Sequence, residues 1–320
     1  MVPHLPSELL RDIISLCLDV KSNRIPLLLT SSVCNAISME LLYTHLRFET
    51  SLQLIRFLCT YGTPLLPLPY PPRTIDVDFT SDATTIFFHL NTLITRCGSL
   101  PEMETDEQGR IVLDILRLRL YSHTQDSGLH MILTSLEQVN PRRFIWTGPD
   151  PPHHFSTAVS LLFTFSAQYL FRAIEGWTNL THLTLTHISL RLPSGNDNLP
   201  FRFPQVPNLR VFYLGQATFI PAESIAIFIL GSAGVTALEK VRLVDAYESS
   251  IWGRRLRRSD IETLAARIVV ASDIGDDEQR KEKVVAGAVK KIRQFITCEG
   301  QTERIIGGDR IPEDSNGVLM

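Results

Sequence analysis

The chain has only five cysteines in 320 residues, and none of them has the spacing of a zinc site or a disulfide framework. The five are Cys17, Cys34, Cys59, Cys97 and Cys298. Most of them lie within apolar runs, where a thiol is usually an inert small hydrophobic side chain. Cysteines used in this way are typical of a reducing compartment, so we expect the protein in the cytoplasm, the nucleus or both.

Motifs that carry catalysis or bind cofactors are missing as well. The sequence has no G-x-S-x-G, H-E-x-x-H, phosphate-binding loop or G-x-G-x-x-G pattern. The single histidine pair, His153-His154, follows a proline-rich loop sequence, and adjacent side chains rarely share a metal ion. We therefore expect no metal, no cofactor and no enzymatic activity. An α/β enzyme with an unrecognised site is kept as an alternative from another functional class.

The sequence also lacks a strong charge bias and a long hydrophobic run. Its net charge is −3 and its pI is near 6.3, which gives no electrostatic reason to expect nucleic acid or a membrane surface as a partner. Pro3, Pro6, Glu8 and Asp12 interrupt any signal-peptide pattern. The longest apolar stretch, residues 158–171, is too short to cross a membrane and is interpreted as a buried helix.

Changes in composition divide the chain into five parts. Residues 1–62 have apolar side chains at helical spacing and predict a small helical unit, with helices near residues 7–17, 25–46 and 51–61. Residues 63–72 hold five prolines and predict a stiff, extended connector. Residues 73–250 alternate strand-like and helix-like runs. Residues 251–300 predict two C-terminal helices, and residues 301–320 predict a frayed tail.

A short leucine pattern recurs in the alternating part. Strands are predicted near residues 73–79, 115–122, 142–148, 180–188, 209–215 and 238–246. The strand centres Leu183, Val211 and Val241 are 28 and 30 residues apart, close to the repeat length of about 20 to 29 residues in leucine-rich repeats. We therefore expect an α/β fold in which an irregular leucine-rich-repeat-like solenoid follows the helical unit and ends in capping helices. An ordinary α/β domain with leucine-rich strands is the alternative.

One basic cluster stands out near the start of the C-terminal helices. It consists of Arg254, Arg255, Arg257 and Arg258. Guanidinium groups bind carboxylates and phosphates in a forked geometry, so the cluster is a candidate site for an acidic or phosphorylated peptide. The favoured interpretation is a solvated loop that leads into the next helix, and four arginines are too few to predict nucleic-acid binding.

The helical unit carries a recognisable pattern. Leu5-Pro6 precedes Glu8-Leu9-Leu10-Arg11-Asp12-Ile13, and a link leads to Leu29-Thr30-Ser31-Ser32-Val33-Cys34. Residues 4–48 resemble the F-box, whose members share a Leu-Pro pair, an E-L-L-x-x-I helix and a second helix around L-x-x-V-C. The following segment and the leucine-rich strands look like those of the many F-box proteins of fungi, where the likeness rests on architecture.

The resemblance implies a binding function without catalysis. The F-box docks on the Skp adaptor of an SCF (Skp–cullin–F-box) ubiquitin ligase, and the repeat region holds a protein substrate. By the resemblance, adaptor docking or its immediate support falls to Leu5, Pro6, Leu9, Ile13, Val33 and Cys34. Residues 35–37 lack the basic residues and tryptophan usual in the family, so a scaffold that no longer binds the adaptor is the alternative. Leu9, Ile13 and Val33 could also serve only to hold the helical unit together.

Overall fold

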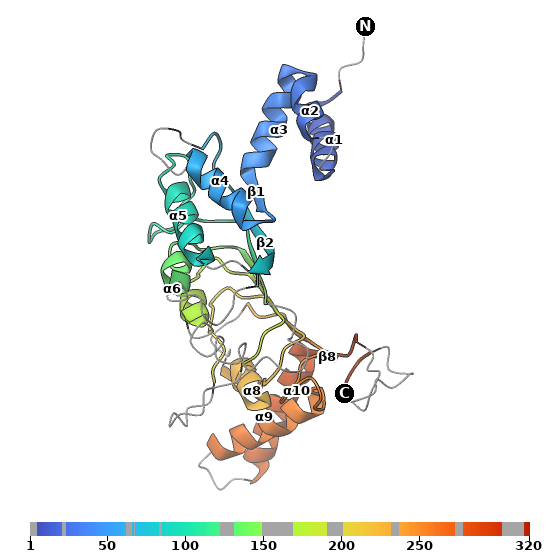
Figure 1. Ribbon diagram of the computed structural model, residues 1–320. Coiled ribbons are helices and arrows are strands. Elements are labelled where there is room, and N and C mark those ends of the chain that lie inside the picture. The colour runs from blue at the N-terminus through green and yellow to red at the C-terminus, as the bar shows by residue number, and fades with distance from the viewer. Residues whose placement is uncertain are drawn as a thin grey trace.

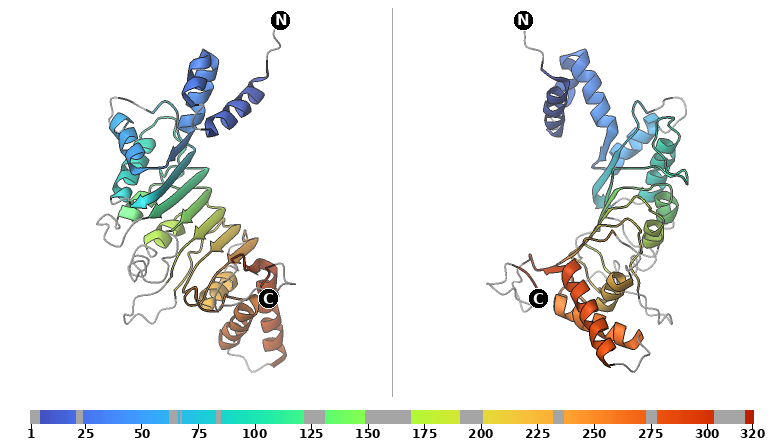
Figure 2. Two further views of the ribbon diagram at one scale, coloured as in Figure 1. Left: turned by 45° about the vertical axis from the view of Figure 1, so that its right-hand side comes forward. Right: turned by 180° about the vertical axis from the view of Figure 1, so that it is seen from behind.

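The structure is a computed structural model that describes residues 5–20, 24–61, 66, 68–82, 85–121, 131–148, 169–190, 201–231, 237–272, 278–302 and 317–320. It confirms the α/β class, because helices pack on one eight-stranded parallel sheet (Figure 1). The N-terminal helices project from one end of the sheet and the C-terminal helices lie at the other (Figures 1 and 2). The pair His153-His154 and most of the stretch 158–171 lie outside the described residues, although residues 169–175 are helical.

The N-terminal unit consists of α1 (Ser7–Asp19), α2 (Arg24–Thr30) and α3 (Ser32–Thr44). The prediction of one helix over residues 25–46 is therefore wrong. Ser31 separates α2 from α3, because it adopts an extended backbone and its Oγ accepts a hydrogen bond from the N–H of Cys34 at 3.1 Å. The unit has a small core of its own, formed by Ile14, Leu18 and Leu41.

All six predicted strands are present, and two further strands complete the sheet. The strands are β1 (His45–Phe48), β2 (Thr74–Asp82), β3 (Ile115–Tyr121), β4 (Arg143–Thr147), β5 (His182–Thr186), β6 (Val211–Gly215), β7 (Lys240–Val244) and β8 (Ile296–Glu299). Each strand pairs in parallel with the next one along the chain, so the order in the sheet is the order in the sequence. The C-terminal end of one strand is thus connected to the start of its neighbour by a crossover, as parallel pairing requires.

The strand register corrects one sequence alignment. Leu183 pairs with Phe212, and Phe212 pairs with Val241, so these buried positions are each 29 residues apart. Val211, which the sequence pattern suggested as the equivalent residue, faces the opposite side of the sheet. A shift of one residue exchanges the two faces of a strand, and here it separates the buried positions from the half-exposed ones.

Helices cover one face of the sheet. They are α4 (Ser51–Tyr61), α5 (Ile86–Gly98), α6 (Met131–Leu136) and α8 (Ala222–Gly231), and Figure 2 shows α4, α5 and α6 stacked along one side. Alternate strand residues and the inner faces of these helices form one continuous apolar core. This alternation leaves the other face of the strands partly exposed, and we call it the open face.

The boundary between the two parts lies earlier than predicted. α3 ends at Thr44 and β1 begins at the next residue, so no linker separates them. Phe48 of β1 and Leu54 of α4 belong to the core of the sheet, not to that of the N-terminal unit. The third predicted helix, α4, is therefore the first helix that covers the sheet, and the helical unit ends at residue 44 instead of residue 62. Within the predicted connector 63–72, residues 66 and 68–72 form neither helix nor strand, and the others lie outside the described part.

The C-terminal end is more ordered than predicted. α9 (Arg258–Ser272) and α10 (Glu278–Phe295) confirm the two expected helices, although α10 ends before residue 298 because β8 follows. Leu319 is buried against the core, and its N–H donates to the carbonyl of Cys298 at 2.8 Å. The prediction of a frayed tail is thus wrong for residues 317–320, while residues 303–316 lie outside the described part.

Candidate functional site

The helical unit exposes an unusual amount of apolar surface. Among the described residues, eight of the seventeen large exposed hydrophobic side chains fall between Leu5 and Val33. Four of them, Leu9, Ile13, Leu16 and Val20, recur at i, i+4, i+7 and i+11 and share one face of α1. The opposite side of α1 packs on the small core through Ile14 and Leu18. α1 is therefore apolar on two sides, and one of these sides faces solvent. We call the eight exposed side chains the apolar stripe: Leu5, Leu9, Ile13, Leu16, Val20, Ile25, Leu29 and Val33.

The residues predicted for adaptor docking are mostly in this stripe. Leu5, Leu9, Ile13 and Val33 are each about half exposed, at 49%, 51%, 48% and 55%, and Pro6 is exposed at the start of α1. Cys34 differs, because it is half-buried and packs against the core of the helical unit. Leu9, Ile13 and Val33 take no part in that core, so their exposure is not explained by a role in holding the helices together.

Four members of the stripe were missed by sequence reasoning, namely Leu16, Val20, Ile25 and Leu29. Leu16, Ile25 and Leu29 are the most exposed of the eight, at 70%, 71% and 79%. The signal for Leu16 was available, since it follows Leu9 and Ile13 at helical spacing. Ile25 and Leu29 lie four residues apart on α2, and recognising them required knowing that α2 is a separate short helix.

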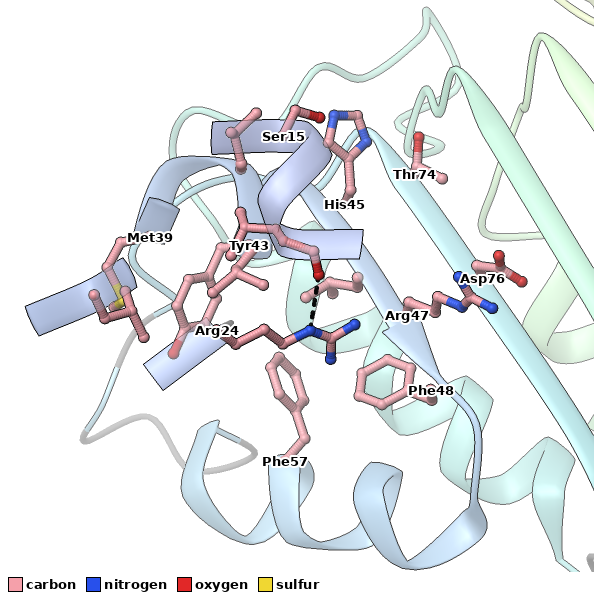
Figure 3. Close-up of a pocket in the computed structure, with 15 residues that line it drawn as sticks. Ser15, Arg24, Met39, Tyr43, His45, Arg47, Phe48, Phe57, Thr74 and Asp76 are labelled. Atoms are coloured by element: carbon pink, nitrogen blue, oxygen red, sulfur yellow. Dashed lines mark hydrogen bonds between the residues drawn. The ribbon is translucent and has the colours of Figure 1, made fainter. Parts of the chain in front are cut away.

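A groove of about 520 Å³ lies where the helical unit meets the sheet (Figure 3). Helix side chains form one wall, and residues of β1 and the start of β2 form the other. Arg24 extends across the groove, and its Nε donates a hydrogen bond to the carbonyl of Leu18 at 3.0 Å. The other residues that line it include the aromatic rings of Tyr43, Phe48 and Phe57 and the polar side chains of Ser15, His45, Arg47, Thr74 and Asp76.

The polar groups of the groove do not form a recognisable catalytic arrangement. A serine nucleophile needs a base within hydrogen-bond reach, and no hydrogen bond joins Ser15 to His45 in the described structure. Asp76 is buried and forms an ion pair with Arg117 at 3.1 Å through Oδ2, while its Oδ1 has no hydrogen-bond partner among the described residues. Burial raises the pKa of Asp76, and the charges of Arg117 and Arg47 oppose that rise.

The arginine cluster is not a solvated loop, and that prediction is wrong for its central member. Arg255 is fully buried, and its Nε donates to Asp245 Oδ1 at 2.8 Å. Asp245 also accepts hydrogen bonds from the N–H and the hydroxyl of Thr302, so the pair holds the segment that follows β8. Arg254 pairs with Asp260, and Arg258 pairs with Glu262. The cluster therefore stabilises the end of the sheet and does not present four available cations to an acidic ligand.

The open face of the sheet is the second large surface. Its strand positions carry six cationic side chains (Arg47, Arg117, Arg119, Arg143, Lys240 and Arg242) and three carboxylates (Asp76, Asp78 and Glu299). The whole chain has a net charge of −3, so this face has the opposite sign to the molecule. No described helix covers it over β4–β6, where Arg143 is exposed and the other side chains of this face are half-exposed (Figure 2).

Three further features of the described ranges concern metal ligands, thiols and membrane-spanning helices. No group of three or more His, Cys, Asp and Glu residues could hold a metal ion there. All five cysteines are free, and burial raises the pKa of Cys97 and Cys298 to about 12, which keeps these thiols protonated and unreactive. None of the described helices has the length and apolar character needed to cross a membrane.

Comparisons with known proteins found no relative of this chain. No family model matches it, and no curated protein and no solved structure is significantly similar to it.

Proposed function

We propose that this protein is a substrate-recognition subunit of an SCF-type ubiquitin ligase. The N-terminal helices act as an F-box-like unit that docks the Skp adaptor, which connects the chain to the cullin scaffold. The sheet acts as an irregular leucine-rich-repeat-like solenoid that binds a protein substrate through its open face. The protein is a binding module in this proposal and carries out no chemistry itself.

The observation that carries the proposal is the apolar stripe on the helical unit. Burial of apolar surface is the main favourable term in protein association, and exposed apolar surface gathered on one part of a protein commonly marks an interaction site. The stripe includes Leu5, Leu9, Ile13 and Val33, which are four of the residues that match the F-box pattern. The position of the unit also supports the proposal, because it projects from one end of the sheet and leaves the open face free for a second partner.

The test is co-expression of the full chain with an Skp adaptor, followed by affinity purification and size exclusion. We expect the chain and the adaptor to form a stable one-to-one complex. A folded chain that elutes alone would overturn adaptor docking and leave the alternative, a repeat scaffold with an F-box-like unit that no longer binds the adaptor.

A further inference from the structure

The open face carries one row of side chains whose cations form no ion pair with a described residue. The register places Arg143, His182, Val211 and Lys240 side by side at the beginning of β4, β5, β6 and β7. Arg143 and Lys240 are exposed, and neither has a carboxylate within ion-pair distance in the described part of the chain. We call Arg143, His182 and Lys240 the basic row.

The other cations of the open face differ from this row because each has a carboxylate partner. Arg117 pairs with Asp76 at 3.1 Å, Arg119 with Asp78 at 3.7 Å and Arg242 with Glu299 at 2.7 Å, while Arg47 lies 3.6 Å from Glu49. These pairs compensate the charge at both ends of the face. Among the described residues, the cations of the open face that form no ion pair thus lie over β4–β7.

The pKa of His182 is lowered in this environment. Burial lowers its pKa first, and the charges of Arg143 and Arg210 lower it further, while Glu239 opposes them. Its Nδ1 is hydrogen-bonded to the hydroxyl of Thr181 at 2.9 Å. The Thr181 hydroxyl donates to the carbonyl of Arg142 at 2.9 Å, so it accepts from Nδ1–H of His182. Nε2 of the neutral ring has no hydrogen bond to a described residue and is available to a donor on a partner.

The next row along the strands is uncharged over β4–β6. It consists of Ile145, Thr184 and Tyr213, which pair in register. The ring of Tyr213 lies over Gly215, where an added Cβ would be 2.7 Å from a ring carbon. The guanidinium of Arg242 lies 5.4 Å from the centroid of the same half-buried ring. Together with Ile145, the remaining ring surface provides an apolar platform beside the basic row.

We propose that the basic row binds the acidic groups of an extended protein segment that crosses β4–β7, with Ile145 and Tyr213 contacting its apolar side chains. This inference rests on the proposed function, since it names the class of substrate that the open face takes. Three strand spacings separate Arg143 from Lys240, or about 14 Å. Side chains at i and i+4 of an extended segment span about the same distance, so carboxylates or phosphates with that spacing match both ends of the row.

A protein segment fits this surface better than nucleic acid. Proteins that bind DNA commonly neutralise about six to ten phosphates, whereas the open face has two cations without a carboxylate partner among the described residues. The apolar platform of Tyr213 and Ile145 is suited to aliphatic side chains between acidic ones.

In the test, peptides from a random display library are selected for binding to the full chain, and the affinity of the best binders is measured. We expect Asp and Glu to be enriched at two positions four residues apart, and Arg143→Glu with Lys240→Glu to weaken binding by at least about tenfold. Lys283→Glu with Lys290→Glu on α10 is the control, because both residues are exposed and the charge change is equal. Arg143→Gln with Lys240→Gln gives a second variant without added repulsion, and thermal unfolding verifies that each variant is folded.

Three results would overturn the inference: peptides without acidic enrichment, equal weakening by the α10 control, or tighter binding of single-stranded DNA than of the selected peptides. Replacing one peptide glutamate by phosphoserine tells whether phosphate or carboxylate is the preferred anion. Adaptor binding by the Arg143→Glu and Lys240→Glu variant is measured in parallel. The two surfaces are separate, so the two outcomes can be distinguished. A variant that loses peptide binding but keeps adaptor binding supports the inference. A wild-type chain that does not bind the adaptor contradicts only the adaptor-docking part of the proposed function.

Discussion

Replacing Leu9 and Ile13 by aspartate is expected to abolish adaptor binding while the sheet remains folded. Each side chain is about half exposed in the free protein. Full burial of a leucine or isoleucine contributes about 1.5–3 kcal/mol, so the remaining half contributes about 1 kcal/mol per residue on docking. Placing two carboxylates in an apolar interface costs about 1–3 kcal/mol each, and more where they stay charged. The sum is about 4–8 kcal/mol, or a loss of roughly 10³- to 10⁶-fold in affinity.

The assay is titration of immobilised Skp adaptor with the purified chain, with thermal unfolding as the test of folding. Leu52→Asp with Val270→Asp is the matched control, because these side chains are 52% and 47% exposed and lie outside the helical unit. The unfolding transition of the sheet should shift by no more than about 3 °C. Binding that stays within threefold of wild type, or an equal loss in the control, would refute the assignment of the apolar stripe to the adaptor. Unfolding of the whole chain by the double substitution would instead assign these residues a structural role.

Three further predictions concern stability. Arg255→Met leaves a buried carboxylate without its cation and should lower the free energy of unfolding by about 3–5 kcal/mol, measured by chemical denaturation. Arg254→Met, at an exposed ion pair, should lower it by about 1 kcal/mol or less. Equal effects of the two substitutions would contradict the burial of the Arg255–Asp245 pair. Gly148→Ala places a Cβ against the backbone carbonyl oxygen of His187 and should cost at least about 1–3 kcal/mol. Gly287→Ala, in open space on α10, should instead stabilise the fold by about 1 kcal/mol. A neutral Gly148→Ala would show that the backbone at His187 is not tightly packed against Gly148. Burial lowers the pKa of His45, His89 and His182, so the fold favours the neutral form of these three histidines. The unfolded chain therefore binds more protons below about pH 6.5, and the melting temperature should decrease as the pH is lowered from about 7.5 to about 5.5. A melting temperature that stays constant or rises over that range would contradict the lowered pKa values.

The middle of the sheet could be predicted from the sequence because its strands alternate apolar and polar residues over five or more positions. β1 and β8 could not, since each has four residues and directly follows a helix whose apolar spacing continues into it. The break at Ser31 had a visible signal in Thr30-Ser31-Ser32, as serine is a preferred N-cap. The burial of Leu319 depends on a contact with Cys298, and no local pattern predicts so distant a partner.

The apolar stripe was partly predictable and the basic row was not. Helical spacing identified Leu9 and Ile13, but only the structure distinguishes the exposed side of α1 from the side that packs on Ile14. The arginines of residues 254–258 attracted attention because they are adjacent in sequence. Arg143 and Lys240 lie 97 residues apart and become neighbours in one row only through the strand register. The pairing of Arg255 with Asp245 could likewise not be predicted, because it depends on how the loop after β7 folds back on the sheet.

Hydrogen–deuterium exchange of the full chain, with and without the Skp adaptor, tests the central claim most directly. Slower exchange is expected in peptides that cover residues 5–34 when the adaptor is present, and unchanged exchange is expected over β4–β7. Exchange that the adaptor leaves unaltered throughout, or slows only on the open face, would contradict the assignment of the helical unit as the adaptor-binding part.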